Sequence, residues 1–274
     1  MKRTKVKSIG VHLLLILCIL IISLPVILAL IISTQNEAQV MSYPPGLIPG
    51  TNMIHNYTTA WNSVGLGRMI FNSTIIAFGV IFGKVTMSIL AAFAFTHFDF
   101  KGKKILFGII LITLLLPVPV RIVALFDIIR SMHLMDTYTG LIIPFWASAT
   151  SIFILIQRFK VVPSELIDAS KMDGCQPMQY FFKVLLPLTR STIGALVVIN
   201  FIYIWNQYLW PLMATNSKEM RVVQIGIKML MSTESTNNWG VIMAGVIITM
   251  VPPLLVFIIM QESFMKGFAL QSDK

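Results

Sequence analysis

The segment RFKVVPSELIDASKMDGCQPMQYFFKVLLPLTRS, residues 158–191, interrupts a chain that otherwise consists mostly of long apolar runs. Its first part predicts a short helix, with Ser164 as the N-cap and Glu165 favoured by the positive end of the helix dipole. The pair Asp173-Gly174 should end this helix, because glycine adopts the positive φ of a helix C-cap without steric cost.

A second helix should follow in the same segment. Gln176 and Pro177 are typical of a helix start, since proline is tolerated in the first turn. Apolar residues then recur at the spacing of one helix face. They are Phe181, Val184 and Leu185. Pro187 should close the helix, because it has no N–H to donate. The sequence therefore predicts a helix–turn–helix that is too polar to cross a membrane and lies against it.

Long apolar runs lie on both sides of this segment. A helix needs about 20 apolar residues to cross the hydrocarbon core of a bilayer. Six stretches qualify, at roughly residues 9–32, 69–96, 105–126, 141–157, 191–214 and 240–260. The sequence predicts an all-α integral membrane protein with six transmembrane helices, forming a single membrane domain over residues 1–274.

The composition agrees with lipid as the solvent. Hydrophobic residues make up 56% of the chain and charged residues only 12%, whereas soluble domains carry roughly 25% charged residues. The formal net charge is +10. Most of the basic residues gather between alternate apolar runs, rather than in one patch of the kind that binds nucleic acid. By the positive-inside rule, both termini and the 158–191 segment should be cytoplasmic.

On pattern alone, this segment is either a structured interhelical loop without a partner or a surface presented to a cytoplasmic protein. Its residues resemble the signature of ABC importer permeases, which is, loosely, Glu-Ala-Ala, three residues, Asp-Gly-Ala, then Phe, Leu-Pro and a final Pro. The counterparts in this chain are Asp168-Ala169-Ser170, Asp173-Gly174-Cys175, Phe181, Leu186-Pro187 and Ser191. Asp168, Ser170 and Cys175 are small changes from that signature, whereas Ser191 loses a proline.

Other stretches resemble the carbohydrate branch of these permeases, the membrane subunits of maltose-type importers. They are FNS at Phe71–Ser73, MDTYTGLIIPF at Met135–Phe145 and FIYIWNQYLWPL at Phe201–Leu212. The resemblance runs over most of the chain and implies a fold like that of type I ABC importers. It also implies a permease subunit that translocates a sugar or oligosaccharide across the bacterial cytoplasmic membrane.

The resemblance further implies partners: a second homologous permease subunit, two ATPase subunits and an extracytoplasmic sugar-binding protein. The helix–turn–helix would dock on an ATPase subunit. The residues implied in this coupling are Glu165, Asp168, Ala169, Asp173, Gly174, Phe181 and Pro187. The partner subunits would use ATP and this chain would bind no cofactor, because its sequence has no G-x-x-x-x-G-K-[ST] phosphate loop.

Other function classes fit the sequence less well. Cys18, Cys175 and the four scattered histidines have no metal-ligand spacing, and no nucleophile–base pair stands out, so an enzyme is not expected. A secondary transporter acting alone on an ion gradient is the alternative. Such transporters commonly show internal repeats and carboxylates near the bilayer midplane. The sequence shows no repeat and no Asp or Glu clearly within a predicted span.

Lys84 falls near the middle of the second predicted span, where an ammonium group is costly unless it faces the protein interior or a wet cavity. The opposite helix face is apolar and suits lipid; it holds Ile75, Phe78, Phe82, Val85, Ile89 and Phe93. Lys84 is therefore either a structural lysine, bonded to a carbonyl oxygen or to a carboxylate of the partner permease, or part of the translocation path. In the path, together with Arg121, it would favour an acidic or strongly hydrogen-bonding sugar. Trp205 and Asn206 are further path candidates, although aromatic residues in spans are as often packing or interface anchors.

Overall fold

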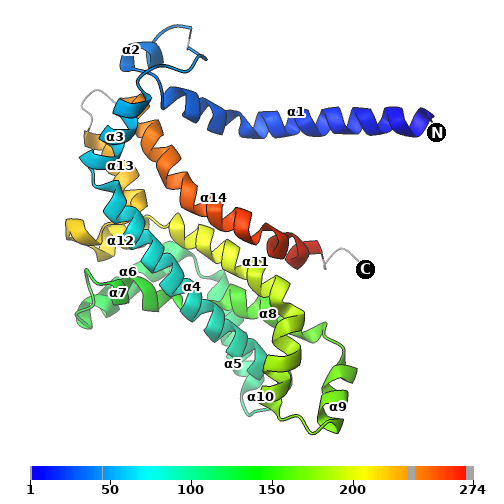
Figure 1. The fold of residues 1–274 in the computed structure, drawn as a ribbon. Helices are drawn as coiled ribbons and strands as arrows, with labels where there is room; N and C mark the ends of the chain where they lie inside the picture. Colours follow the sequence, from blue (N-terminus) through cyan, green and yellow to red (C-terminus); the bar gives the residue numbers. More distant parts are fainter. Residues whose placement is uncertain (1, 45, 234–237, 270–274) are drawn as a thin grey trace. The chain divides into compact units, whose positions relative to one another are not determined.

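The computed structural model describes residues 2–44, 46–233 and 238–269, and the regular secondary structure in these ranges is helical, with no strand (Figure 1). The chain divides into two compact units. One comprises Met1–Gly67 with Gly226–Val251, and the other comprises Arg68–Ile225 with Pro252–Lys274. The single membrane domain expected from the sequence remains a prediction.

The first unit contains α1 (Lys2–Ile32), α2 (Glu37–Val40), α3 (Met53–Ser63) and parts of α13 (Val223–Thr233) and α14 (Trp239–Ala269). The segment after α1 is held by Asn56 of α3, whose Nδ2 donates to the carbonyl oxygens of Ser33 at 2.9 Å and Gln35 at 2.8 Å. A Cβ atom at Gly240 would lie 2.6 Å from the same Nδ2. Glycine at this position therefore lets α14 approach α3 closely.

The second unit contains the remaining helices, in the order α4 (Leu66–His97), α5 (Lys103–Leu115), α6 (Val118–Ser131), α7 (Tyr138–Ile142), α8 (Ala149–Lys160), α9 (Ser164–Met172), α10 (Pro177–Tyr180), α11 (Leu186–Trp205) and α12 (Leu209–Ala214). A 3-10 turn, Ile143–Phe145, follows α7. A π-helical turn, Phe181–Leu185, joins α10 to α11, so that one helix runs from Pro177 to Trp205.

The helices agree with the six predicted spans once two bent pairs are each counted as one span. Four helices are long and apolar enough to cross a membrane: Gly10–Ile32, Leu66–His97, Pro177–Trp205 and Trp239–Met265. The bent pairs are Lys103–Leu115 with Val120–Ser131, at 108°, and Tyr138–Phe145 with Ala149–Lys160, at 41°. The third predicted span is therefore not a straight helix. Its break falls at Pro117, which is extended with ψ 141° and cannot donate a backbone hydrogen bond.

The fifth predicted span, residues 191–214, differs from the observed helix at both ends. The helix begins earlier, at Pro177, and ends at Trp205. At this end the Asn206 Nδ2 donates to the Ile202 carbonyl oxygen at 2.9 Å. Such a side-chain bond competes with continuation of the helix. Beyond a short break, Leu209–Ala214 form the separate helix α12.

Candidate functional site

The predicted helix–turn–helix is present and forms one end of the second unit (Figure 1). After α9, the Gly174 N–H donates to the Lys171 carbonyl oxygen at 3.0 Å, and the Cys175 N–H donates to that of Ser170 at 2.9 Å. These two bonds form a Schellman motif. Gly174 has a φ of +70°, which confirms the predicted left-handed C-cap conformation.

The start of α9 differs from the prediction. Ser164 is the first helical residue, and Pro163 takes the N-cap position. The carbonyl oxygen of Pro163 accepts the hydrogen bond of the Leu166 N–H at 3.2 Å. The assignment of Ser164 as the N-cap is therefore wrong. The physical reason is the ring of Pro163, which holds φ at −57° and lets the backbone turn from extended to helical at this residue.

The outer face of α9 and its following turn is open. The exposed residues include Glu165, Asp168, Ala169, Asp173 and Gly174. Met172 is the most uncovered of the apolar side chains in this helix, at 89% exposure. An exposed ion pair joins Lys171 Nζ to Asp168 Oδ1 at 3.6 Å, and exposed pairs of this kind contribute little stability. This face therefore presents both carboxylates and an apolar side chain, a combination that suits contact with a protein partner better than exposure to bulk water.

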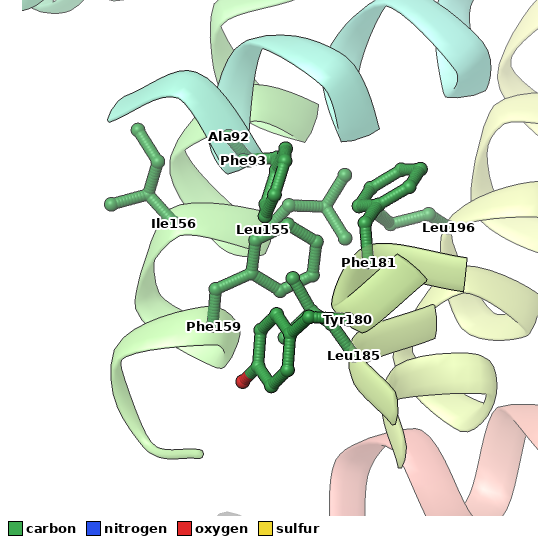
Figure 2. Close-up of a cluster of buried hydrophobic side chains, with 9 residues drawn as sticks. All are labelled: Ala92, Phe93, Leu155, Ile156, Phe159, Tyr180, Phe181, Leu185 and Leu196. Carbon is green, nitrogen blue, oxygen red and sulfur yellow. The ribbon is translucent and has the colours of Figure 1, made fainter. Parts of the chain in front are cut away.

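The second half of the segment is anchored in a hydrophobic core cluster, shown in Figure 2. The cluster comprises Ala92, Phe93, Leu155, Ile156, Phe159, Tyr180, Phe181, Leu185 and Leu196. These residues come from α4, α8, α10, the π-helical turn and α11. Phe181 and Leu185 are fully buried and Val184 packs partly buried against them, which confirms the predicted apolar stripe.

A set of aromatic contacts links this segment to α4. Ring centroids lie 4.6 Å apart for Phe181 and Phe93, 4.8 Å for Phe93 and His97, and 5.4 Å for His97 and Tyr180. The His97 Nε2 and the Tyr180 hydroxyl are both buried without a hydrogen-bond partner. Because a close-packed interior has little free space to absorb movement, a displacement of the segment would be transmitted to the end of α4.

Pro187 does not close the second helix, contrary to the prediction. It is exposed in the first turn of α11, and the helix continues beyond it. In the preceding π-helical turn the Leu186 N–H donates to the carbonyl oxygen of Phe181, five residues back. This turn shifts the hydrogen-bond register before the proline. The missing N–H of Pro187 then falls in a first turn, where it is tolerated.

Lys84 is buried in α4, with 5% of its surface exposed. Its Nζ lies 5.4 Å from the ring centroid of Tyr203 on α11. The ion pairs at Lys103 and Lys171 do not involve Lys84. Within the part of the chain that the structure describes, Lys84 therefore has a cation–π contact and no carboxylate partner.

The opposite face of α4 is only partly the lipid face that the sequence suggests. Phe78 and Phe82 are exposed, as expected, but Val85 and Phe93 are buried. The assignment of Val85 and Phe93 to a lipid face is wrong. Phe93 packs on Phe181, so the helix–turn–helix covers this end of α4 on a side that hydropathy alone assigns to lipid.

The other candidates for the translocation path differ in how far their side chains are exposed. Trp205 is 2% exposed and stacks on Phe201, with ring centroids 5.5 Å apart and an interplanar angle of 16°. Trp205 is therefore a packing residue. Asn206 is exposed, and its Oδ1 accepts a hydrogen bond from Gln224 Nε2 at 3.2 Å. Arg121 is exposed on α6.

A polar network near the start of α4 was not predicted from the sequence. Asn72 Nδ2 donates to the carbonyl oxygens of Glu219 at 2.6 Å and Arg221 at 2.8 Å. The Tyr138 hydroxyl donates to Asn72 Oδ1 at 2.7 Å. Asn72 and Tyr138 lie in two of the stretches that resemble sugar permeases, but no local pattern indicates that they meet.

Comparisons with known proteins agree on one family and one fold. The family model "Binding-protein-dependent transport system inner membrane component" matches residues 84–268. The chain is 39% identical over 263 residues to the sn-glycerol-3-phosphate transport system permease protein UgpE of Yersinia pestis, covering 93% of this chain and 94% of that protein. The same values hold for UgpE of Escherichia coli (strain UTI89 / UPEC).

Solved structures extend the likeness to the fold. A chain of a bacterial ABC transporter involved in the import of the acidic polysaccharide alginate matches with a TM-score of 0.81 at 19% identity, over 96% of this chain and 98% of that one. A second structure, of a bacterial alginate ABC transporter in complex with alginate pentasaccharide-bound periplasmic protein, matches with a TM-score of 0.66 at 16% identity, over 94% of each chain.

Proposed function

This chain belongs to the family of binding-protein-dependent transport system inner membrane components, and from that membership we propose that it is one membrane-spanning permease subunit of an ATP-driven importer. It is a multi-pass inner membrane protein, not itself a catalytic enzyme. In this proposal, two partner ATPase subunits bind and hydrolyse ATP. A second homologous permease completes the passage, and an extracytoplasmic binding protein delivers the substrate.

The open face of α9 is the observation that best supports the proposal. The residues that would contact an ATPase subunit are the exposed ones: Glu165, Asp168, Ala169, Asp173 and Gly174. Behind them, Phe181 is buried against Phe93 of α4. Closure of the ATPase pair would displace α9, and the buried aromatic contacts would carry this displacement to α4. Pro187 would belong to the stiff start of α11 rather than to the docking face.

The proposed cargo is a sugar or oligosaccharide, with sugar phosphates included. The relatives are named as transport proteins for sn-glycerol-3-phosphate, and the solved structures are of importers of an acidic polysaccharide. Lys84 and Asn206 are proposed to line the path. Trp205 would pack behind the residues that line the path and would not contact the cargo, because its ring is stacked on Phe201.

The alternative, a secondary transporter acting alone, fits less well. The family is described by its dependence on a binding protein, whereas an ion-coupled carrier needs neither that protein nor an ATPase. An exposed α9 with an uncovered methionine at its end also has no role in a carrier that works alone.

The proposed orientation, with both termini and the helix–turn–helix in the cytoplasm, has a direct test. Cys175 lies in the turn after α9 and is partly exposed, while Cys18 lies within the first apolar helix. A membrane-impermeant maleimide should label Cys175 in inside-out vesicles and leave it unlabelled in intact cells. Cys175→Ser serves as the background control. Labelling of Cys175 from outside intact cells would reverse the orientation.

The function itself is tested with the complex of both permeases and the ATPase subunits, reconstituted in proteoliposomes with the binding protein. We expect ATP-dependent uptake of substrate and stimulation of ATP hydrolysis by the loaded binding protein. Both should be lost when this chain is omitted. Uptake that proceeds without ATP, driven by an imposed ion gradient, would support the secondary transporter instead.

A further inference from the structure

Lys84 occupies the most unfavourable position that a membrane helix offers to a charge. From the helical rise, it lies about 27 Å from the start of α4 and about 20 Å from its end, which places it deep in a hydrocarbon core about 30 Å thick. Its side chain is 5% exposed. Ionisable residues at such depth mostly pair with one another, bond to carbonyl oxygens or face a wet cavity.

Among the described residues, Lys84 neither pairs with another ionisable side chain nor bonds to a carbonyl oxygen. No carboxylate and no carbonyl oxygen in the ranges 2–44, 46–233 and 238–269 forms an ion pair or hydrogen bond with Lys84. Its contact is the ring of Tyr203, whose centroid lies 5.4 Å from Nζ. A cation–π contact compensates only part of the lost hydration and leaves the three N–H donors of the ammonium group unused.

A second unused donor lies one turn away on the same helix face. Ser88 follows Lys84 at i+4, which places the two side chains next to each other on α4. The Ser88 hydroxyl is fully buried and has no hydrogen-bond partner. A serine in a helix usually bonds to a carbonyl oxygen of the preceding turn, so an unpaired hydroxyl beside an unpaired ammonium group indicates an acceptor that is absent from the chain itself.

Polar side chains lie on the Tyr203 side of Lys84. Tyr203 covers the ammonium group on one side and is itself 46% exposed. One turn further along, Asn206 is exposed and bonded to Gln224. Polar side chains at this depth avoid lipid and face either a wet path or a protein partner. The Lys84 ammonium therefore lies beneath the half-exposed ring of Tyr203, with the polar end of α11 one turn away.

We propose that Lys84 and Ser88, covered by the ring of Tyr203, form a binding site for the anionic group of the transported sugar, a phosphate or a carboxylate. The inference rests on the proposed importer function and adds to it the charge of the cargo and the residue that selects it. Lys84 would supply the charge, Ser88 a neutral donor, and Tyr203 a ring that moves aside as the passage opens.

The test uses the complete reconstituted importer with three probes: sn-glycerol-3-phosphate as a phosphate ester, an alginate trisaccharide as a carboxylate, and maltotriose as a neutral sugar. We expect ATP-dependent uptake of an anionic probe. Lys84→Met should lower its uptake by about tenfold or more, the effect of losing a hydrogen bond from a charged group. Lys84→Arg should keep most of the uptake, and Ser88→Ala should raise KM without lowering complex yield.

Phe82→Leu is the control, because it changes an exposed side chain on the opposite face of α4; it should transport like the wild type. Normal uptake of the anionic probe by Lys84→Met, or loss of complex yield in that variant, would overturn the inference and make the lysine structural. A wild-type importer that takes up only maltotriose would overturn it while leaving the proposed function intact. If no probe is taken up and the binding protein does not stimulate ATP hydrolysis, the proposed function itself fails.

Discussion

The indole ring of Trp146 lies directly on the backbone of Gly83 in α4, so that a Cβ atom at position 83 would overlap the ring. One turn earlier, the indole Nε1 donates a hydrogen bond to the carbonyl oxygen of Gly79 at 3.0 Å. These contacts hold the bend between α7 and α8 against α4, immediately beside Lys84. The glycines at 79 and 83 are therefore what allows the two elements to approach.

Gly83→Ala should destabilise the protein. The indole cannot move away without losing its bond to Gly79, and overpacking of this kind costs about 1–3 kcal/mol. Thermal unfolding of the purified complex should show a lower midpoint. Gly108→Ala is the control, because a Cβ atom there has no neighbour within 4 Å. Equal midpoints for the two variants would contradict the close packing of Trp146 on α4.

Gly174→Val should uncouple ATP hydrolysis from transport. The φ of +70° costs a residue with a side chain about 1 kcal/mol or more, and the strain would distort the turn that presents α9. We expect ATPase activity with reduced uptake, or weaker retention of the ATPase subunits, with membrane insertion preserved. Asp173→Ala should have a milder effect.

Gly102 offers a matched control for this experiment. It also has a positive φ, of +84°, and open space around its Cβ position, but it lies in the turn before α5. Gly102→Val should therefore carry a similar backbone strain and leave the ratio of uptake to ATP hydrolysis unchanged. If both variants uncouple equally, the effect comes from strain and not from docking of α9.

Met172→Gln should weaken binding of the ATPase subunit. The side chain is 89% exposed at the end of α9 and is the most open apolar group on the proposed docking face. The few residues that dominate an interface each cost more than about 1 kcal/mol when truncated. If Met172 is such an anchor, its replacement should weaken retention of the ATPase in detergent by about tenfold. Met132→Gln changes an exposed methionine after α6 and should have no effect. Equal retention for Met172→Gln and the wild type would remove Met172 from the interface.

Two tyrosine substitutions should have different effects on stability. The Tyr180 hydroxyl is buried without a partner, so Tyr180→Phe should raise the unfolding midpoint or leave it unchanged. The Tyr138 hydroxyl donates to Asn72 at 2.7 Å, so Tyr138→Phe should cost about 1 kcal/mol. Calorimetry on the purified complex compares the two. A larger loss for Tyr180→Phe would mean that its hydroxyl has a partner in the assembled importer.

Asp136 should make a stabilising contribution that depends on pH. Burial acts to raise the pKa of its carboxyl group, but hydrogen bonds from Ser217 and Asn216 outweigh this and lower the pKa below its ordinary value. The stabilisation is then fully present above about pH 4 and is lost as the pH falls through the lowered pKa. Asp136→Asn keeps a residue type that tolerates the φ of +59°.

The Asp136→Asn variant should unfold at a lower temperature than the wild type at pH 7, because its amide oxygen accepts the same hydrogen bonds without a charge. The difference should shrink as the pH falls below about 4, where the carboxylate is protonated first in the unfolded chain and then in the folded protein. A difference that stays constant over this range would show that the charge of Asp136 does not contribute to stability.

The sequence by itself determined the elements whose cause is local. Apolar runs long enough to span a bilayer identify the spans, since hydropathy is a property of each segment alone. The turn at Asp173-Gly174 follows from the conformational freedom of glycine, and the φ of Gly174 agrees with it. The stripe of Phe181 and Leu185 follows from helical spacing, and both residues are buried.

Only the tertiary structure decided which faces of these helices are covered and where the spans break. Phe93 reads as a lipid-facing residue, yet Phe181, from a segment 88 positions later in the chain, lies against it. Pro187 reads as a helix end, yet the π-helical turn before it lets the helix continue. Burial depends on neighbours from distant segments, and a proline's effect depends on the hydrogen-bond register around it. Neither quantity can be obtained from a local pattern, which is why Lys84 could be placed in a span from the sequence, while its ring contact with Tyr203 could not.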